Sequence, residues 1–372
     1  MGSVGGGGTG SLSVGPISGI GSIILNGVRF DDSLARVLEL DDDGGPRDRK
    51  ELKLGMMVRI KGKVKARKDD KTDEAEEIIF GSDLLGPIDG GSINAAAQTF
   101  KVFGQTVQIT ATTVFENDLT FAALSANDIV EVYGFVDPVS SLMTATRIER
   151  KLLANVKVFK LQGKISNLNT ATFQIGTLVI GFSPNVILPA GLSLSSGLLV
   201  RVRLATTPAT GTRAALRIRQ VEVETEDRDQ AEVKGTVTEF TSSAKFSVNG
   251  LQIDASGIST LPAGLKSGAR VEVEGRLVKG VLVARKVELE DEQDQLKFEL
   301  HGTVSGRAAT SADVTFTLTS SGGVPVKVTV VLANVQFDSG LTAAGLRDGV
   351  RLEVKGVAFS DGTIKATRIK LD

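Results

Sequence analysis

Apolar and polar residues alternate with a period of two along many short stretches of this chain. Clear examples are Val-Glu-Val-Glu at 271–274 and Leu-Glu-Val-Lys at 352–355. This alternation predicts β-strands that bury one face and expose the other to water. Further strands are predicted where apolar and β-branched residues follow a turn glycine, as in Leu-Gln-Ile at 251–253. We therefore expect an all-β protein.

The alternating strand belongs to a longer signature, Leu-x-x-Gly-x-x-apolar-x-apolar-x-Gly, which recurs five times with some replacements. Its occurrences begin at Leu52, Leu124, Leu194, Leu265 and Leu346. The spacing of 70 to 81 residues is longer than most solenoid repeats and long enough for a small core, so it predicts tandem domains. The predicted boundaries are 1–11 for a Gly-rich tether and 12–84, 85–152, 153–226, 227–293 and 294–372 for five β-barrel modules, the first with charged insertions.

Each module is predicted to contain three strands, a short helix or 3-10 turn, and two more strands. The first strand is centred on a glycine, which in a strand interior indicates a bulge or a bend. These glycines are Gly15, Gly86, Gly163, Gly235 and Gly302. Asn26-Gly27 and Asn249-Gly250 predict type I′ hairpins. This order of elements is that of a small OB-like barrel. An immunoglobulin-like sandwich is the alternative, but it needs about seven strands and about a hundred residues.

The glycine of Leu-x-x-Gly is predicted to be a structural turn residue. Asparagine replaces it once, and both residue types tolerate the left-handed backbone conformation that ends a helix. We interpret five residues as C′ caps of the short helix: Gly55, Asn127, Gly197, Gly268 and Gly349.

Composition excludes several classes of function. The chain has 43 Lys and Arg against 44 Asp and Glu, a formal net charge of -1, so we expect no nucleic-acid binding. Trp and Cys are absent, and Tyr and His occur once each, at Tyr133 and His301. This removes most aromatic stacking and most imidazole or thiolate chemistry. No apolar run reaches the roughly twenty residues that a membrane-spanning helix needs.

The Gly-Pro-Ile or Gly-Thr-Val opening, the Asn-Gly hairpin, the Leu-x-x-Gly signature and the Ala-Thr-Arg-Ile close resemble a bacterial repeat family, the domain of unknown function 5666. The resemblance covers nearly the whole chain after Ser11. It implies a secreted or lipid-anchored envelope protein in which a lipobox Cys precedes a Gly-rich stretch. Gly5 to Gly8 match that stretch, but no Cys precedes them. Membrane association is therefore expected only through an N-terminal lipid anchor that this sequence lacks. The family brings no catalytic residues.

The acidic joints between modules offer the carboxylate oxygens that Ca²⁺ prefers. The candidate ligands are Glu224, Asp227, Glu290 and Asp291. The alternative is that these charge runs are solvated linkers. We expect no other cofactor or metal.

Other polar and aromatic positions are predicted to be structural. His301 occupies an outward strand position before the repeated glycine, so we expect it on the surface without a chemical role. Four phenylalanines beside turn glycines are predicted to be core rather than a stacking stripe for a polymer: Phe100, Phe173, Phe246 and Phe316. Basic residues that recur once per module, such as Arg147, Arg217 and Arg368, form either a ladder for an acidic polymer or, as we favour, partners for neighbouring Glu.

Together these features predict a non-catalytic scaffold or assembly subunit of the bacterial envelope, extracellular, on the outer-membrane surface or in the periplasm. Partly open barrels expose strand edges, so we expect protein partners or self-association by strand addition. The alternative is an OB-like array that binds a polysaccharide or another extended polymer along one face. An enzyme would have little beyond paired carboxylates to work with.

Overall fold

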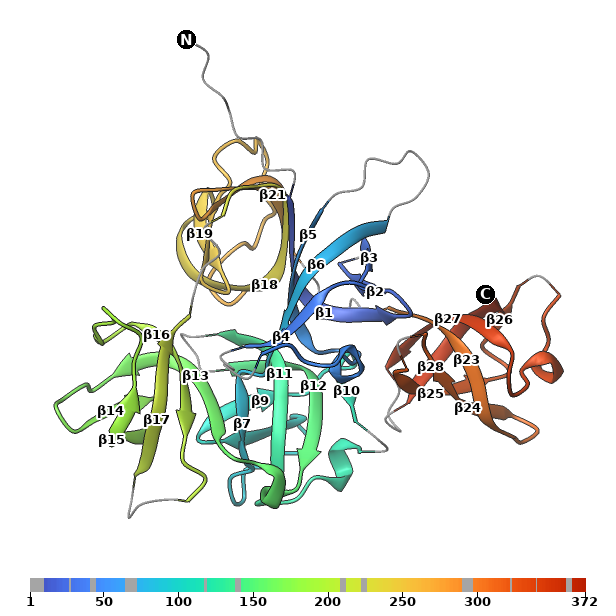
Figure 1. The fold of residues 1–372 in the computed structure, drawn as a ribbon, viewed down its shortest axis with the longest axis horizontal. Helices are drawn as coiled ribbons and strands as arrows, with labels where there is room; N and C mark the ends of the chain where they lie inside the picture. The colour runs from blue at the N-terminus through green and yellow to red at the C-terminus, as the bar shows by residue number, and fades with distance from the viewer. Residues whose placement is uncertain are drawn as a thin grey trace, which may run out of the picture. The chain divides into compact units, whose positions relative to one another are not determined.

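The computed structural model describes residues 10–26, 28–40, 45–63, 72–116, 119–137, 142–207, 212–221, 226–289, 297–321, 323–338, 340–358 and 363–372. In these residues the chain is all-β with isolated 3-10 turns, and its strands close into small barrels (Figure 1). The predicted all-β, OB-like fold class is confirmed. No helix in the described part of the chain is long and apolar enough to cross a membrane.

The first barrel shows the pairing scheme. Its elements are β1 (Gly10–Ile20), β2 (Ile23–Leu25), β3 (Val28–Asp31), β4 (Arg36–Glu39), the 3-10 turn η1 (Arg49–Glu51), β5 (Met57–Lys63) and β6 (Thr72–Phe80). β1, β2 and β3 pair antiparallel in sequence, and β3 and β4 run parallel to β6. β6 then pairs with β5, and β5 returns to β1, which closes the cycle.

Two further cycles follow along the chain. The first has β7 (Leu84–Pro87), β8 (Thr99–Val102), β9 (Gln105–Gln108), β10 (Val114–Phe115), η2 (Phe121–Ala123), β11 (Ile129–Asp137) and β12 (Leu142–Lys151). After η3 (Leu153–Asn155), the second has β13 (Phe159–Ser166), β14 (Thr172–Ile175), β15 (Leu178–Ile187), β16 (Leu199–Leu204) and β17 (Arg213–Gln220). β9 runs parallel to β12, and β15 runs parallel to β17, as β3 does to β6.

The remaining two cycles repeat the scheme. One has β18 (Arg228–Ser242), β19 (Lys245–Val248), β20 (Leu251–Asp254), β21 (Arg270–Val278) and β22 (Val281–Leu289). The other has β23 (Phe298–Ala309), β24 (Asp313–Thr319), β25 (Pro325–Val331), β26 (Gln336–Phe337), η4 (Ala343–Gly345), β27 (Arg351–Ala358) and β28 (Ile364–Leu371). β18 pairs with β21 and β23 with β27, so the opening strand closes each barrel.

The barrel interiors contain the alternating apolar residues that the sequence marks. On β16, Val200, Val202 and Leu204 are at most 1 % exposed, while the residues between them face outward. The four phenylalanines expected in the core are 0 to 4 % exposed, which confirms that prediction: Phe100, Phe173, Phe246 and Phe316. They therefore offer no stacking platform.

The opening-strand glycine and the hairpin asparagine pack against each other. Asn249 and Gly250 have φ of +50° and +83° between the paired residues Val248 and Leu251, which confirms the two-residue hairpin. The Asn249 side chain lies over Gly235, where an added Cβ would come within 2.3 Å of Nδ2. Asn249 Nδ2 donates to the carbonyl of the residue before Gly235, and its Oδ1 accepts from the amide of the residue after it. Position 235 requires glycine because the Asn249 side chain, hydrogen-bonded to the backbone on both sides of it, leaves no room for a Cβ atom.

The last glycine of the signature is explained by a β-bulge. The β21–β22 register shifts at Gly275, where an added Cβ would lie 2.2 Å from the carbonyl oxygen of Val283. Gly62, Gly134 and Gly356 occupy the same place in their own barrels. In the barrel of residues 159–220 the bulge position is Leu204 instead.

The five Leu-x-x-Gly turn residues have left-handed backbones, with φ between +68° and +88°. The amide of each donates to a carbonyl of its opening strand or of the residue that follows it, as Gly268 does to Val237. Their interpretation as helix C′ caps is wrong, because η1 ends at a C-cap of Leu52, three residues before Gly55. Residues 188–198 and 255–269 contain no helix at all. These residues occupy β-turns that pin the loop to the opening strand.

The barrels are joined by strand pairing. They form two compact units. One contains the described residues of 10–80, 226–358 and 363–372, and the other contains those of 81–221. In the first unit β1 runs parallel to β18 and to β23; in the second β7 runs antiparallel to β13. A simple tandem array of five modules is therefore not confirmed, because β1 pairs the first barrel with two barrels that do not follow it in the sequence.

Candidate functional site

The chain's one histidine lies on the outward face of β23, yet it is buried. His301 is 8 % exposed, so its predicted surface position is wrong. The alternation itself holds, because the neighbouring Leu300 is in the core. What covers the outward side is the β1–β2 turn: a Cβ on Gly21 would lie 2.6 Å from that of His301. The burial of His301 by this turn could not be predicted from a local sequence pattern, because the pairing of β1 with β23 joins residues almost three hundred positions apart.

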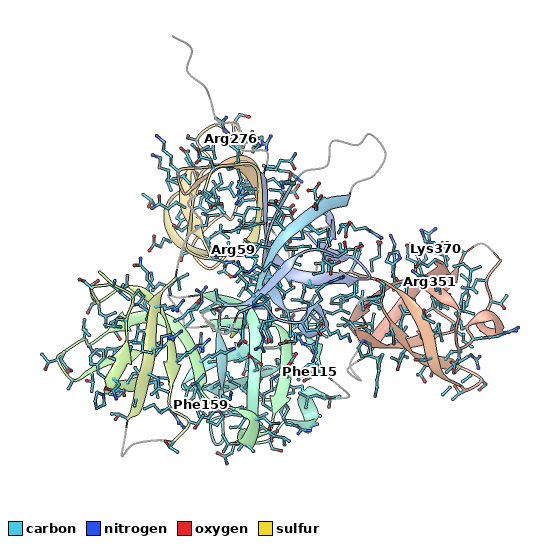
Figure 2. All side chains as sticks on the ribbon, viewed as in Figure 1. Arg59, Phe115, Phe159, Arg276, Arg351 and Lys370 are labelled. Carbon is cyan, nitrogen blue, oxygen red and sulfur yellow. The ribbon has the colours of Figure 1, made fainter. Side chains whose placement is uncertain are left out.

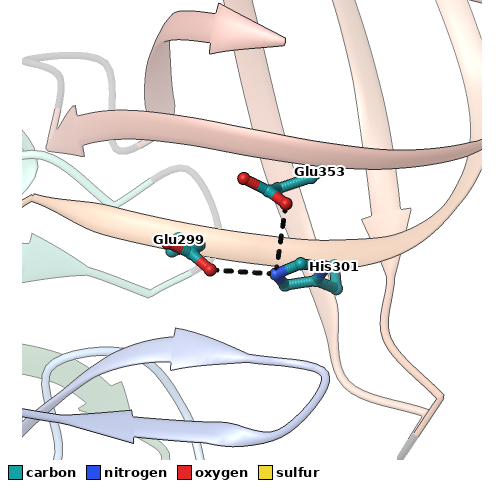
Figure 3. A group of neighbouring side chains, drawn as sticks. All are labelled: Glu299, His301 and Glu353. Atoms are coloured by element: carbon teal, nitrogen blue, oxygen red, sulfur yellow. Dashed lines mark hydrogen bonds and ion pairs between the residues drawn. The ribbon is translucent and has the colours of Figure 1, made fainter. Parts of the chain in front are cut away.

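His301 is the centre of a charged cluster. Its Nε2 lies 2.7 Å from Nη2 of Arg29 and 3.1 Å from Oε1 of Glu299, and its Nδ1 lies 2.9 Å from Oδ1 of Asp372. A carboxylate oxygen of Glu353 is 3.9 Å from Nε2 (Figure 3). Arg29, from β3, also pairs with Glu299 at 2.6 Å. We call these five residues the His301 cluster.

Three residues of this cluster have the types and spacing of a metal site. Glu299, His301 and Glu353 place ligand atoms within 4.8 Å of one another. However, Nζ of Lys355 is 3.0 Å from Glu299, and Nζ of Lys370 is 2.7 Å from Glu353. The Arg29 guanidinium contacts the imidazole and Glu299, so a metal ion would have to displace cations already paired there. The arrangement fits an ion-pair network better than a metal centre.

Protonation of His301 favours its hydrogen bonds with carboxylates over its hydrogen bond with Arg29. Burial lowers the pKa of His301, but hydrogen bonds with Glu299 and Asp372 outweigh it and the net pKa is raised. The hydrogen bond with His301 is the first cause of a lowered pKa at Glu299. In contrast, Nε2 accepts from Arg29 only when the imidazole is neutral. Protonation therefore strengthens bonds inside the barrel of residues 298–371 at the expense of the bond to Arg29 of the first barrel.

A second charged cluster lies beside the β7–β13 pairing. Glu131 is 7 % exposed, and it accepts from Ser82 Oγ at 2.6 Å. Lys160 and Lys151 each place Nζ 3.1 Å from its carboxylate. Burial raises the pKa of Glu131, but the two lysines and Ser82 outweigh it and lower the pKa to about 2. Lys160 belongs to β13, so this ion pair links two barrels.

A third inter-barrel contact is aromatic. The guanidinium of Arg213 lies 5.1 Å from the ring centroid of Phe103 and 5.0 Å from that of Phe159, a cation–π arrangement with two rings. Phe103 lies in the turn between β8 and β9 and has a φ of +54°. The turn between β19 and β20 has Asn249 at the equivalent position. The Asp89 carboxylate accepts from the amide of Phe103 and of the next residue. A phenylalanine in an asparagine position is the sequence signal that could have revealed this junction.

The proposed calcium ligands are not brought together in the described residues. Glu224, Glu290 and Asp291 lie outside those residues. Asp227 is exposed, and its carboxylate accepts from the amide of Lys279 at 2.6 Å, in the β21–β22 hairpin. Its observed role is to hold a turn, and calcium binding stays a prediction.

Comparison with protein-family models supports the resemblance. The model of a domain of unknown function (DUF5666) matches residues 86–149, 234–288 and 301–370, together just over half of the chain. The chain belongs to this family. A search of curated proteins gave no match. The matched DUF5666 regions fall on the barrels of β7–β12, β18–β22 and β23–β28. The barrel with Leu204 at the bulge is outside them.

Proposed function

We propose that this chain is a non-catalytic scaffold that acts outside the bacterial cytoplasm, in the envelope or on the cell surface. This proposal is based on the pairing of opening strands between barrels. β1 pairs with β18 and β23, and β7 pairs with β13, so every opening strand belongs to an inter-barrel ladder. Main-chain hydrogen bonds across barrel boundaries favour stiff units over freely jointed beads.

The polar clusters support the same proposal. Lys160, Arg29 and Arg213 each reach from one barrel to a neighbour within its unit. Ionisable groups are thus engaged in holding barrels together. Self-association by strand addition has less support than the repeat pattern suggested, because the opening-strand edges are already paired within the chain.

Hydrogen exchange on the full chain tests the joints. If the barrels form units, the amides of residues 11–14 and 230–233 are expected to exchange together and as slowly as core strands. Independent, fast exchange at these residues would contradict the scaffold.

Location is tested separately by fractionating cells that express the gene from its native start. We expect the protein in the envelope or medium fraction. Recovery in the cytosol would contradict the proposed location, while leaving the exchange result valid.

A further inference from the structure

The one histidine of the chain lies where two barrels of the same unit meet. His301 is on β23, and it is covered by Gly21 of the β1–β2 turn and contacted by Arg29 of β3. Nearby, Ser321 Oγ donates to the carbonyl of Gly21 at 3.1 Å. In the described residues β1 and β23 share two residue pairs, whereas β1 and β18 share four. A single side-chain interaction therefore counts for more at this short contact, which we call the β1–β23 junction.

The contacts of the imidazole define its protonation state. Nδ1 of His301 lies 2.9 Å from Oδ1 of Asp372, and an ionised carboxylate only accepts hydrogen bonds, so Nδ1 carries a proton. Nε2 lies 2.7 Å from Nη2 of Arg29, and a guanidinium only donates, so Nε2 has no proton when it accepts from Arg29. The joined barrels therefore favour a neutral imidazole with its proton on Nδ1.

A second proton on the imidazole has opposite effects on the two barrels. Nε2–H would donate to Oε1 of Glu299, 3.1 Å away in the same barrel. It would also face Nη2 of Arg29 at 2.7 Å, where two donors and two positive charges meet. Arg29 then has to move away, because neither group can accept a hydrogen bond from the other. Protonation therefore weakens the β1–β23 junction, while the barrel of residues 298–371 gains a charge-assisted hydrogen bond.

The charges that the structure places around the imidazole come from four strands. Arg29 is on β3 of the first barrel. Gly21 and Ser22, in the β1–β2 turn, are uncharged. The others are on strands β23, β27 and β28 of the barrel that contains His301: Glu299, Glu353, Lys355, Lys370 and Asp372. Release of this barrel would therefore remove Arg29 and keep every other charge of this set.

This division sets the sign of the pH dependence. Burial, to which the β1–β2 turn contributes, lowers the pKa of His301; hydrogen bonds with Glu299 and Asp372 raise it, and the charge of Arg29 lowers it. Release would relieve the lowering effects and keep the raising ones, so the released barrel would bind the proton more tightly. By linkage, the junction is strongest above the pKa of the released form and weakens as the pH falls towards the pKa of the joined form, which is itself raised above 6.5. Glu299 and Asp372, whose pKa values are lowered, stay charged over this range.

The other barrels have different side chains at the position of His301. The residues directly before their opening-strand glycines are Val14, Leu85, Gln162 and Lys234. None of these types has a usual pKa between 5 and 8, where the charge of histidine changes. Histidine at this position is therefore not a requirement of the barrel.

We propose that His301 makes the β1–β23 junction sensitive to pH, so that a proton on its imidazole releases the barrel of residues 298–371 from the first barrel. The released barrel stays folded, because β23 remains paired with β24 and β27 within it and the hydrogen bonds of His301 with Glu299 and Asp372 are kept. This inference goes beyond the proposed scaffold function and does not depend on where the protein acts.

Hydrogen exchange on the full chain, corrected for the pH dependence of the intrinsic exchange rate, measures the junction at pH 8.5 and pH 5.5. We expect the protection of residues 19–25 and 298–302 to fall by about fivefold at the lower pH, which is at the small end of typical couplings between two sites. Residues 11–14 and 230–233, in the β1–β18 ladder, should not lose protection with them. Equal protection of the junction at both pH values, or a loss that the β1–β18 ladder shares, would overturn the proposal. Fast exchange of the β1–β18 ladder at both pH values would instead contradict the scaffold alone.

Variants separate the proton on His301 from general effects of acid. His301→Gln can donate to Asp372 and accept from Arg29 but does not titrate, so we expect a protected junction at both pH values. His301→Lys is positively charged at both, so low protection is expected at both. Arg29→Gln should reduce the pH response, because no guanidinium then faces the protonated imidazole.

Arg351→Gln is the matched control. Arg351 also pairs with Asp372, at 2.9 Å, but it lies on β27 and its side chain is 58 % exposed, so we expect the wild-type pH response. A full pH response in the His301→Gln protein, or an unchanged one in the Arg29→Gln protein, would show that another group weakens the junction and would overturn the proposal.

Discussion

The barrels of residues 159–220 and 298–371 have the same strand order and opposite surface chemistry. The outward residues of β16 and β17 are paired basic with basic, at Arg203 and Arg217. The outward residues of β27 and β28 are paired acidic with basic, at Glu353 and Lys370 (Figure 2 labels Lys370). The fold therefore fixes which positions are neighbours, while the side chains decide whether those neighbours attract or repel one another.

The two barrels also differ inside, and this difference gives the largest expected effect. Gly356→Leu would bring a Cβ within 2.5 Å of the Lys365 carbonyl oxygen, and Leu204→Gly would remove a fully buried side chain. We expect each to destabilise its own barrel by about 3–5 kcal/mol, because one adds a backbone clash and the other a cavity.

Hydrogen exchange followed by mass spectrometry would locate the loss to residues 298–371 or 159–220. Gly257→Ala is the matched control, since an added Cβ there meets nothing within 4 Å. If both bulge variants were as stable as this control, the bulge would not explain the signature.

A second comparison concerns pH, because the buried Glu131 and the partly buried Glu232 have pKa values shifted in opposite directions. The pKa of Glu131 is lowered to about 2, so its contribution is complete above its usual pKa near 4.5 and is lost as pH falls towards 2. The pKa of Glu232 is raised to about 9, first by burial and then by Glu272. Its folded form favours the proton, so stability is lost as pH rises from about 4.5 to 9.

We expect acid to weaken the β7–β13 unit first and alkali to weaken the β1–β18 ladder first. Melting curves at pH 3, 7 and 9.5 of the Glu131→Gln and Glu232→Gln proteins check this. Glu131→Gln should reduce the loss of stability in acid, where Glu299 also contributes, and Glu232→Gln should reduce the loss in alkali. If Glu131→Gln altered the melting temperature in alkali instead of acid, or Glu232→Gln in acid instead of alkali, another group would be responsible for the pH dependence.

A third prediction contrasts the same kind of substitution on the two outward faces. Arg203→Glu should raise the stability of its barrel, and Lys370→Glu should lower that of its own, because the first replaces like charges with opposite ones and the second does the reverse. Both effects are expected to be about 0.5–1 kcal/mol and smaller at high salt. Urea denaturation followed by local hydrogen exchange measures them. Effects of the same sign would refute the contrast.

The smallest effect is expected at the junction of β3 with the His301 cluster. Arg29→Gln removes a partly exposed ion pair with Glu299, so a loss of less than about 1 kcal/mol is expected. The observable consequence is the titration of His301 followed by NMR. Without the guanidinium, which lowers its pKa, His301 should titrate at a higher pH than in the wild type. A lower value would mean that Arg29 does not face the imidazole.

Much of the fold was readable from the sequence because its determinants are local. Alternation marked the buried stripe of each strand, and Asn249-Gly250 marked a hairpin whose backbone angles demand those residue types. The turn residue that is Gly268 in one barrel and Asn127 in another indicated a left-handed backbone, which both have. The error was to place these residues at helix ends, since a left-handed φ serves a β-turn equally well.

The candidate sites were less predictable, because they depend on which barrels meet. His301 has the outward position that its strand period requires, but only the β1–β23 pairing buries it beside Arg29. Residues 153–221 contain eight Lys and Arg and no Asp or Glu, a local imbalance that the net charge of -1 for the whole chain does not reveal.

The sequence by itself determined the barrel, because alternation, turn chemistry and glycine at crowded backbone positions act within about seventy residues. Only the tertiary structure decided how barrels are joined and which charges become neighbours. The sequence of a strand edge does not specify a distant partner, and only the cross-strand register makes neighbours of residues such as Arg203 and Arg217.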